Sequence, residues 1–426
     1  MNMNLEKICR VLIYRLGSLG DTIVALPSFH LVRETFPRAH VTLLTSVTLN
    51  SKAAPVASIL EGTRLVDDYI EYSVSLRDPR GLAKLRAQIW RRGFDCLIYL
   101  AEPRGGVAIS LRDALFFLSC GIFRQIGVPY RRRDLYCLPV PGTEFYRPES
   151  ERLVGNLTRL GQPDLNDNRW WDLHLSADER RAAEDFLGGM DPSAPLLAVS
   201  MGTKVEVKDW TEPNWVRLLR ELDRHYPDYG LVALGSQDES ARSDRILVEW
   251  SGPKRNLCGV TGPRVSAAIL ERATLFIGHD SGPMHLAACV GTPCVAIFAA
   301  RNLPGQWYPR GKNHHIIYHK TECYGCMCYT CYNYPNLCIL SITAEEVFYA
   351  VVNQLSRRPT RIEGRCVAGL PDRQALPRHS IDTTATNLPP SSEATRKIAF
   401  VQENDLTDAL SRIPSQFQRP GGSRRD

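Results

Sequence analysis

Residues 274–298 read TLFIGHDSGPMHLAACVGTPCVAIF, and this stretch decides the fold. Two apolar runs, 274–277 and 294–298, have the length of buried strands, and a helical pattern over 283–290 lies between them. This order predicts a parallel β-α-β unit. Ser281 is placed to be the N-cap of the helix and Pro283 lies in its first turn. The unpaired N–H groups and the dipole of that helix start would then face an anion.

The alternation of strands and helices continues on both sides of this stretch. In the first half we predict strands at 8–14, 41–45, 69–72 and 96–100, with helices at 21–35, 48–60 and 81–92. In the second half we predict strands at 196–200 and 230–234, with helices at 212–225, 265–272 and 343–355. Alternation of this kind predicts parallel sheets with helices on both faces.

A proline-rich region between residues 139 and 195 interrupts the pattern and separates the two halves. We therefore predict an α/β chain of two Rossmann-like, doubly wound domains facing each other across a cleft. The predicted boundaries are 1–162 for the first domain, 163–195 for a crossover and 196–358 for the second domain. Residues 359–426 change to a composition of Arg, Pro, Ser, Thr and Gly without periodicity, which predicts a disordered tail.

The composition of the chain indicates which kinds of molecule it can bind. The chain has 426 residues and a formal net charge of +6, a mild excess that suits an anionic substrate or membrane surface rather than nucleic acid. Charged residues near the N-terminus argue against a signal peptide, and no apolar stretch reaches the ~20 residues needed to span a bilayer. The longest apolar candidates are residues 107–123 and 285–300, and both are predicted to be buried elements. We expect a cytoplasmic protein that can touch the inner leaflet.

Two further motifs follow predicted strands. Gly17-Ser18-Leu19-Gly20-Asp21 opens a helix and has G-x-x-G spacing rather than the dinucleotide fingerprint. Asp21 can be a helix cap, or a carboxylate at the ligand edge of the sheet.

Gly202-Thr203 and Lys208-Asp209-Trp210 follow the strand at 196–200. Lys208 can neutralise a phosphate, or it can be a solvated surface lysine, as can Lys204.

The third polar cluster, Asp280, Ser281, Gly282 and His285, lies between apolar runs and is the most informative of the three. A basic run, Arg131–Arg133, can flank an anionic acceptor or simply be solvated.

Five of the 13 cysteines gather between residues 323 and 338. Cys323/Cys326 and Cys328/Cys331 are two C-x-x-C pairs, and four thiolates can bind zinc tetrahedrally. Only Met327 separates the pairs, which would cramp a zinc ribbon. Reduced or partly paired cysteines in a loop are therefore the preferred interpretation, and no metal is predicted at the active site.

Four stretches together resemble glycosyltransferase family nine, the ADP-heptose:lipopolysaccharide heptosyltransferases. The stretches are RLGSLGDTIVALPSFHLVRETFP from residue 15, KDWTEPNW from 208, GHDSGPMHLAACVGTPCVAIFAARNLPGQWYP from 278 and CILSITAEEVFYAV from 338. The resemblance covers residues 8–355. It implies an inverting sugar transfer between two Rossmann domains of the GT-B type, without a cofactor.

By resemblance, Asp21 would be the general base on the acceptor hydroxyl, Lys208 would neutralise the donor diphosphate and Asp280 would contact the transferred sugar. Ser281, Gly282, His285 and Thr203 would lie near the phosphates. Gln237 stands where some members of the family place a ribose-binding Glu, so Asp238 or Glu239 can take that role instead.

The resemblance also implies the partners: a nucleotide-diphosphate sugar donor, ADP-heptose, and an anionic glycan or glycolipid acceptor, with possible peripheral membrane contact and no nucleic acid. Two rival interpretations stay open at this point. One is a nucleotide-sugar epimerase, and the other is a non-catalytic protein that binds sugar nucleotides.

Overall fold

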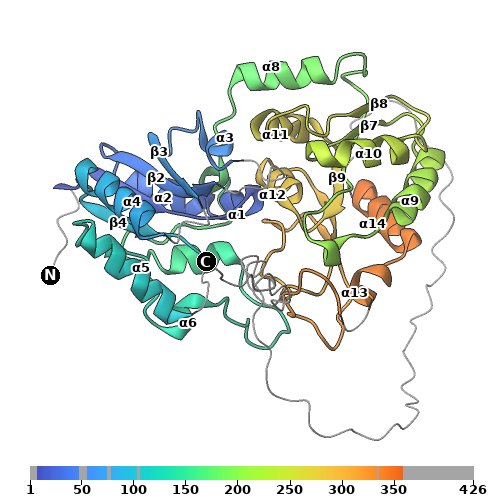
Figure 1. Ribbon diagram of the computed structural model, residues 1–426. Helices are drawn as coiled ribbons and strands as arrows, with labels where there is room; N and C mark the ends of the chain where they lie inside the picture. Colours follow the sequence, from blue (N-terminus) through green and yellow to red (C-terminus); the bar gives the residue numbers. More distant parts are fainter. Residues whose placement is uncertain (1–6, 48–54, 74–77, 103–105, 333–334, 358–426) are drawn as a thin grey trace, which may run out of the picture. The chain divides into compact units, whose positions relative to one another are not determined.

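The computed structural model describes residues 7–47, 55–73, 78–102, 106–332 and 335–357, and Figure 1 shows their arrangement. Two parallel sheets organise this part of the chain, as predicted. The predicted tail lies outside the described residues.

The first sheet has the strand order β3-β2-β1-β4-β5, and every pair of neighbours is parallel. Its strands are β1 Arg10–Tyr14, β2 His40–Val47, β3 Asp68–Ser73, β4 Cys96–Tyr99 and β5 Gln125–Ile126. The helices connecting or following them are α1 Leu19–Val24, α2 Leu26–Thr35, α3 Ala57–Leu60, α4 Pro79–Arg92 and α5 Val107–Ser119. Strand order reverses at β1, so α1 begins at a topological switch point, where open α/β sheets bind ligands.

The second sheet has the order β11-β10-β9-β6-β7-β8 and is also parallel throughout. Its strands are β6 Leu196–Ser200, β7 Gly230–Ala233, β8 Lys254–Asn256, β9 Leu275–His279, β10 Cys294–Phe298 and β11 His315–Tyr318. The helices are α9 Glu212–His225, α10 Ser240–Leu247, α11 Pro263–Arg272, α12 Gly282–Cys289, α13 Leu337–Leu340 and α14 Ala344–Ser356, with the 3₁₀ turns η3 Glu206–Lys208 and η4 Gln237–Glu239. Here the switch lies between β6 and β9.

The segment between the sheets is mostly irregular backbone interrupted by short helices. It contains α6 Arg132–Leu135, α7 Glu149–Gly155, the 3₁₀ helix η2 Asn168–Trp171 and α8 Ala177–Phe186.

Side-chain alternation along the strands divides the core by face. In β1, Leu12 and Tyr14 join a cluster with α4 and α5, whereas Val11 and Ile13 join one with α1 and α2. Period-two alternation in a strand buried on both faces produces this division. The second cluster does not stop at the first sheet, because it also includes one face of the second sheet with α11 and α12.

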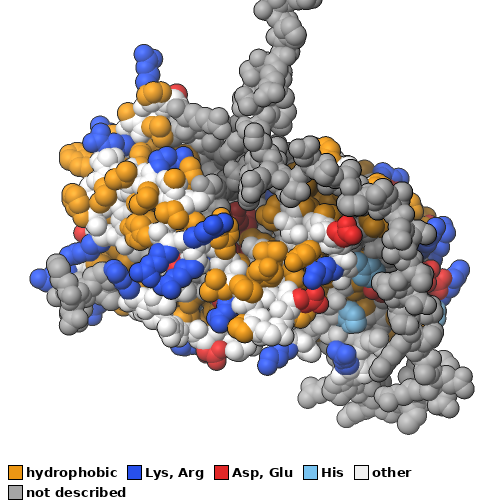
Figure 2. Space-filling model, turned by 90° about the horizontal axis from the view of Figure 1, so that it is seen from below, with side chains coloured by type: hydrophobic (Ala, Val, Ile, Leu, Met, Phe, Trp, Pro, Cys, Tyr) orange, Lys and Arg blue, Asp and Glu red, His pale blue; other side chains and the backbone are white. Residues whose placement is uncertain are grey.

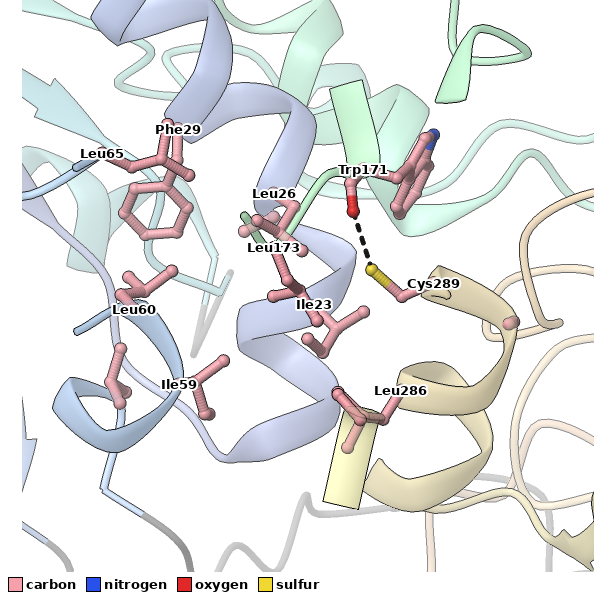
Figure 3. Packing of buried hydrophobic residues seen from close by; sticks show 14 of the residues in the cluster. Ile23, Leu26, Phe29, Ile59, Leu60, Leu65, Trp171, Leu173, Leu286 and Cys289 are labelled. Carbon is pink, nitrogen blue, oxygen red and sulfur yellow. Dashed lines mark hydrogen bonds between the residues drawn. The ribbon is translucent and has the colours of Figure 1, made fainter. Parts of the chain in front are cut away.

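Helix α1 packs directly against α12, and Figure 3 shows Ile23 of α1 beside Leu286 of α12, with Leu26 of α2 in the same cluster. In the same cluster, Cys289 Sγ donates to the carbonyl of Trp171 at 2.9 Å. The predicted ligand edges of the two halves are therefore brought together by a shared apolar core.

Two expectations from the sequence were wrong in part. The helix expected over 21–35 is two helices that break at Ala25. Pro27 cannot occupy a helix interior without losing a hydrogen bond and clashing with the preceding turn, so the helix restarts just before it.

The apolar stretch 107–123, expected to be buried, is only half buried. Ala114 and Phe117 face the core, but Leu111 and Leu115 on the other side of α5 are 44% and 64% exposed and Phe123 is 81% exposed. Among the described residues, none of the helices has the length and apolar character to cross a bilayer.

Candidate active site

A buried ion pair joins two of the predicted site residues. Lys208 Nζ lies 2.7 Å from Asp280 Oδ2 and donates to the Asp280 backbone carbonyl at 3.0 Å. The two side chains are only 12% and 4% exposed. Asn302 Nδ2 donates to the same carboxylate oxygen at 2.7 Å. An ammonium has three protons, so Lys208 keeps one that can be donated to a phosphate oxygen.

The loop that carries Lys208 is held by the neighbouring motif residues. The Trp210 N–H donates to His279 Nε2 at 3.1 Å, and His279 Nδ1 lies 3.2 Å from the Gly202 carbonyl. Burial lowers the pKa of His279 to about 4, so its ring is neutral and can accept from Trp210 while it donates to Gly202. Asp209 completes the anchor by accepting two hydrogen bonds from Arg242, at 2.8 and 2.9 Å. His279 and Asp209 are thus structural supports of the Lys208 loop.

The N-terminus of α12 lies beside this ion pair. Ser281 is the N-cap residue, as predicted, but its hydroxyl donates to the carbonyl of His279 instead of capping the helix within the described residues. The first N–H groups of a helix have no partners inside it, so those of α12 can bind an anion.

His285 is buried, and its Nε2 lies 4.0 Å from Asp280 Oδ1. Burial lowers the pKa of His285 to about 4, and the charge of Lys208 acts in the same direction. The neutral ring therefore offers one N–H donor.

Asp21 lies in the first turn of α1. The structure is compatible with both interpretations from the sequence, a helix cap and a carboxylate at the ligand edge of the sheet. Asp21 Oδ2 accepts from the Ser18 N–H at 2.6 Å and from Ser18 Oγ at 3.0 Å, which is a capping interaction. Burial alone would raise the pKa of Asp21. A hydrogen bond with the Glu102 carboxyl, the charge of Arg15 and the Ser18 donors outweigh burial and hold the pKa below its usual value. The carboxylate is therefore ionised at neutral pH and able to accept a proton.

Helices α1 and α12 approach each other with their N-terminal ends. A Cβ on Gly20 would lie 3.0 Å from His285 Cδ2, and a Cβ on Gly282 would lie 2.9 Å from the Leu19 side chain. The charge of Asp21 acts on His285 and raises its pKa slightly against the effect of burial. Glycines at both positions thus permit the contact that brings Asp21 near His285, whose Nε2 lies 4.0 Å from Asp280 Oδ1.

The remaining predicted residues lie at the carboxyl edge of β6 and β7. Thr203 forms a local turn, because its Oγ1 accepts from the Val205 N–H at 3.3 Å. Gln237 is exposed at the start of η4. The Glu239 carboxylate instead lies between Gly202 and Gly235, where a Cβ on either glycine would collide with it. The Glu239 carboxylate therefore lies at this edge, where its Oε2 accepts from the Ser236 N–H at 3.0 Å.

The cysteine loop contains Cys323, Cys326, Cys328 and Cys331 as free thiols. Within the described residues, which omit 333–334, no three potential ligands are grouped closely enough to hold a metal ion. Hydrogen bonds hold the loop to the end of the β10 segment, since the Gly325 N–H donates to the Ala300 carbonyl and Arg301 Nε donates to the Cys328 carbonyl.

Sequence reasoning missed two polar partners of the site, Asn302 and Glu102. Each follows closely after a predicted strand, Cys294–Phe298 for Asn302 and Cys96–Leu100 for Glu102. The carboxyl end of a parallel strand is the signal that points to both.

Comparison with known proteins finds heptosyltransferases both among family models and among single relatives. A family model for glycosyltransferase family 9 (heptosyltransferase) matches residues 83–336. The lipopolysaccharide core heptosyltransferase OpsX of Haemophilus influenzae is 22% identical over 296 residues, which are 68% of this chain and 79% of that protein. Lipopolysaccharide heptosyltransferase 3 of Escherichia coli is 27% identical over 183 residues, 42% of this chain and 50% of that protein.

Solved structures share the fold. A family 9 glycosyl transferase from Veillonella parvula has a TM-score of 0.65 at 19% identity and covers 84% of this chain and 99% of its own. E. coli ADP-heptose lps heptosyltransferase II has a TM-score of 0.59 at 16% identity, with coverage of 82% and 99%. E. coli heptosyltransferase WaaC with ADP-2-deoxy-2-fluoro heptose has a TM-score of 0.53 at 15% identity, with coverage of 81% and 99%.

Proposed function

Because this chain belongs to glycosyltransferase family 9, the heptosyltransferases, we propose that it transfers a heptose from ADP-heptose to a lipopolysaccharide-type acceptor with inversion at the anomeric carbon. The observation that carries this proposal is the approach of α1, with Asp21 in its first turn, to the N-terminus of α12 beside the Lys208–Asp280 pair. Such an approach places a proton acceptor opposite a set of cationic and N–H donors. The names of the similar proteins support ADP-heptose as donor and lipopolysaccharide as acceptor.

In this scheme residues 196–358 bind the donor. The third proton of Lys208, the α12 N–H groups and the neutral His285 ring stabilise the negative charge that develops on the departing diphosphate. Thr203 and Ser281 lie beside these donors, and Asp280 contacts the transferred sugar while it positions Lys208. Residues 163–195 join this half to the other.

Residues 1–162 bind the acceptor. Its hydroxyl oxygen attacks the anomeric carbon, the bond from that carbon to the phosphate oxygen breaks, and the nucleoside diphosphate leaves. Asp21 accepts the hydroxyl proton, and Glu102 and Ser18 keep the Asp21 carboxylate in place and ionised. A positioned base of this kind contributes typically 10²–10⁴-fold to the rate.

A panel of nucleotide sugars read by thermal shift, followed by mass spectrometry of the product, tests the proposal. Transfer of heptose from ADP-heptose to the acceptor is the expected result. An epimerised nucleotide sugar as product, or binding without any product, would replace it with one of the two rival interpretations.

For the ribose we propose Glu239 rather than Gln237, because the Glu239 carboxylate lies at the edge of β6 and β7. We expect Glu239→Gln to weaken ADP binding about tenfold or more, since a hydrogen bond to a charged group contributes about 1.5–3 kcal/mol. Calorimetry with ADP and its 2′- and 3′-deoxy analogues checks this. The variant should lose the preference for the intact ribose that the wild type has, whereas the matched change Gln237→Ala should keep it. The reverse outcome would return the ribose contact to Gln237.

We also propose that the transfer needs no metal, because Lys208, His285 and the α12 N–H groups together supply the charge stabilisation. Activity measured within seconds of adding EDTA should therefore be unchanged. If the cysteine loop does bind zinc through four thiolates, the metal is structural, and chelation should lower the melting temperature slowly without an immediate effect on rate. Metal content is measured in parallel. Immediate loss of activity that magnesium restores would show that a metal ion takes part in the transfer.

A further inference from the structure

Helix α5 has an apolar face that the core does not use. Its inner face packs on the first sheet through Ala114 and Phe117, and the Phe117 ring lies 5.2 Å from that of Tyr14. Leu111, Leu115 and Leu118 follow at helical spacing on the outer face and are 44%, 64% and 38% exposed. An ordinary surface helix is polar on this side. An apolar stripe facing water therefore needs an explanation beyond folding.

Neighbouring side chains extend the stripe. Trp90 on α4 is 64% exposed and lies beside the turn after α5, where a Cβ on Gly121 would be 3.4 Å from Trp90 Cδ1. Phe123 follows that turn and is 81% exposed. We call Trp90, Leu111, Leu115, Leu118 and Phe123 the α5 surface. Exposed apolar surface gathered in one place marks an interaction site more often than scattered single residues do.

Positive charge surrounds the α5 surface. Residues 78–134, from the N-cap of α4 to the end of the basic run, contain eleven arginines and lysines and five acidic residues, so their net charge of +6 equals that of the whole chain. Exposed Arg86 on α4 donates to the carbonyl of Ser119 at the end of α5, which places a guanidinium beside the stripe. Asp113, an acidic residue on α5, is engaged by Arg112 and Tyr99. Figure 2 shows the molecule from below. Hydrophobic side chains gather on this face, with Lys and Arg side chains among them and few Asp or Glu side chains.

Charge complementarity decides between possible occupants. A second copy of the chain would bring an equally cationic surface into contact with this one. The chain's own residues 360–426 contain ten Arg and Lys against eight Asp and Glu, so they too have a positive net charge. An anionic phospholipid bilayer supplies what neither of these does, namely negative charge at its surface and an apolar layer below it.

We propose that the α5 surface docks this protein on an anionic phospholipid membrane, with the exposed apolar side chains entering the acyl boundary and the flanking arginines contacting headgroup phosphates. α5 begins at the carboxyl end of β4, the sheet edge that carries Asp21, and runs back across the first sheet, so Trp90, Leu118 and Phe123 lie toward the opposite edge of the same half. A docked molecule therefore holds its acceptor half next to the lipid surface. The docking depends on the surface alone and does not rest on the proposed donor or acceptor.

Co-sedimentation of the full chain with lipid vesicles tests the proposal. The wild type should bind vesicles of phosphatidylglycerol and phosphatidylethanolamine at least tenfold more tightly than vesicles of phosphatidylcholine, and 0.5 M salt should weaken the binding. Leu115→Gln with Phe123→Gln should lower binding to the anionic vesicles at least tenfold. The matched control is Val248→Gln with Tyr349→Gln, two residues of the second half with 74% and 61% exposure.

Transfer to a water-soluble acceptor fragment should be the same in both double variants and the wild type, because neither touches the site. Circular dichroism and the melting temperature show whether the variants are folded. Equal vesicle binding by the wild type and the α5 double variant would overturn the proposal. So would a wild type that ignores vesicles and forms a dimer that the α5 substitutions dissociate.

Discussion

Asp21→Asn is expected to lower the rate of transfer by 10²–10⁴-fold while donor affinity stays nearly unchanged. The asparagine side chain has the size of the aspartate and still offers an oxygen to Ser18, which in the wild type donates to Asp21 at 2.6 and 3.0 Å. It cannot take a proton from an acceptor hydroxyl. Asp21 belongs to the first half and the Lys208–Asp280 pair to the second, so donor binding has no direct need of the carboxylate.

The measurements for Asp21 are kcat with saturating donor and the Kd for ADP by calorimetry. Ser18→Ala is the control, since it removes one of the Asp21 hydrogen bonds and leaves the base in place. It should cost about 1 kcal/mol of stability, as the loss of a helix cap does, and change the rate little. If Asp21→Asn weakened ADP binding as much as it slowed transfer, Asp21 would be only a structural cap.

Lys208→Met has the second largest expected effect, a loss of ADP affinity of about ten- to a hundredfold. That range corresponds to a hydrogen bond with a charged group, about 1.5–3 kcal/mol. The methionine keeps the apolar stem but donates nothing to the diphosphate. Lys204→Ala is the matched control, because Lys204 is exposed on the same loop, and it should lose much less affinity.

Stability must be separated from binding in this experiment, since Asp280 is 4% exposed and loses its ion-pair partner in Lys208→Met. Breaking a buried pair on one side costs about 3–5 kcal/mol of folding free energy. The double variant Lys208→Met with Asp280→Asn removes both charges and should regain much of the stability without regaining ADP affinity. A double variant that binds ADP as the wild type does would exclude Lys208 as the diphosphate ligand.

Local signals were enough to predict most of the fold. β6, α9 and β10 begin and end where hydrophobic periodicity and flanking Pro or polar residues place them. The sequence did not predict the break at Ala25 that Pro27 causes in the helix expected over 21–35. It also did not predict that α5 is exposed on one side. Periodicity reports that a face is apolar, but it does not report what covers that face.

The residues of the candidate site could be proposed from the sequence, but their arrangement could not. Motif resemblance selected Asp21, Lys208 and Asp280, yet the pairing of Lys208 with Asp280 spans 72 residues of sequence and depends on strands β6 and β9 being neighbours. Asn302 and Glu102 each follow a predicted strand, but only the sheet order shows which strand ends meet at the site. Gln237 and Glu239 differ by two positions, and only the packing of Glu239 against Gly202 and Gly235 distinguishes them.

The apolar cluster shared by the two sheets has a consequence for how the chain unfolds. Ile23 and Leu26 from the first half and Leu286 from the second belong to one continuous core. Each half on its own would expose that face to water, at about 25 cal/mol per Å² of apolar surface. The two sheets are therefore energetically one cooperative unit, and heat or denaturant should melt them together rather than in sequence.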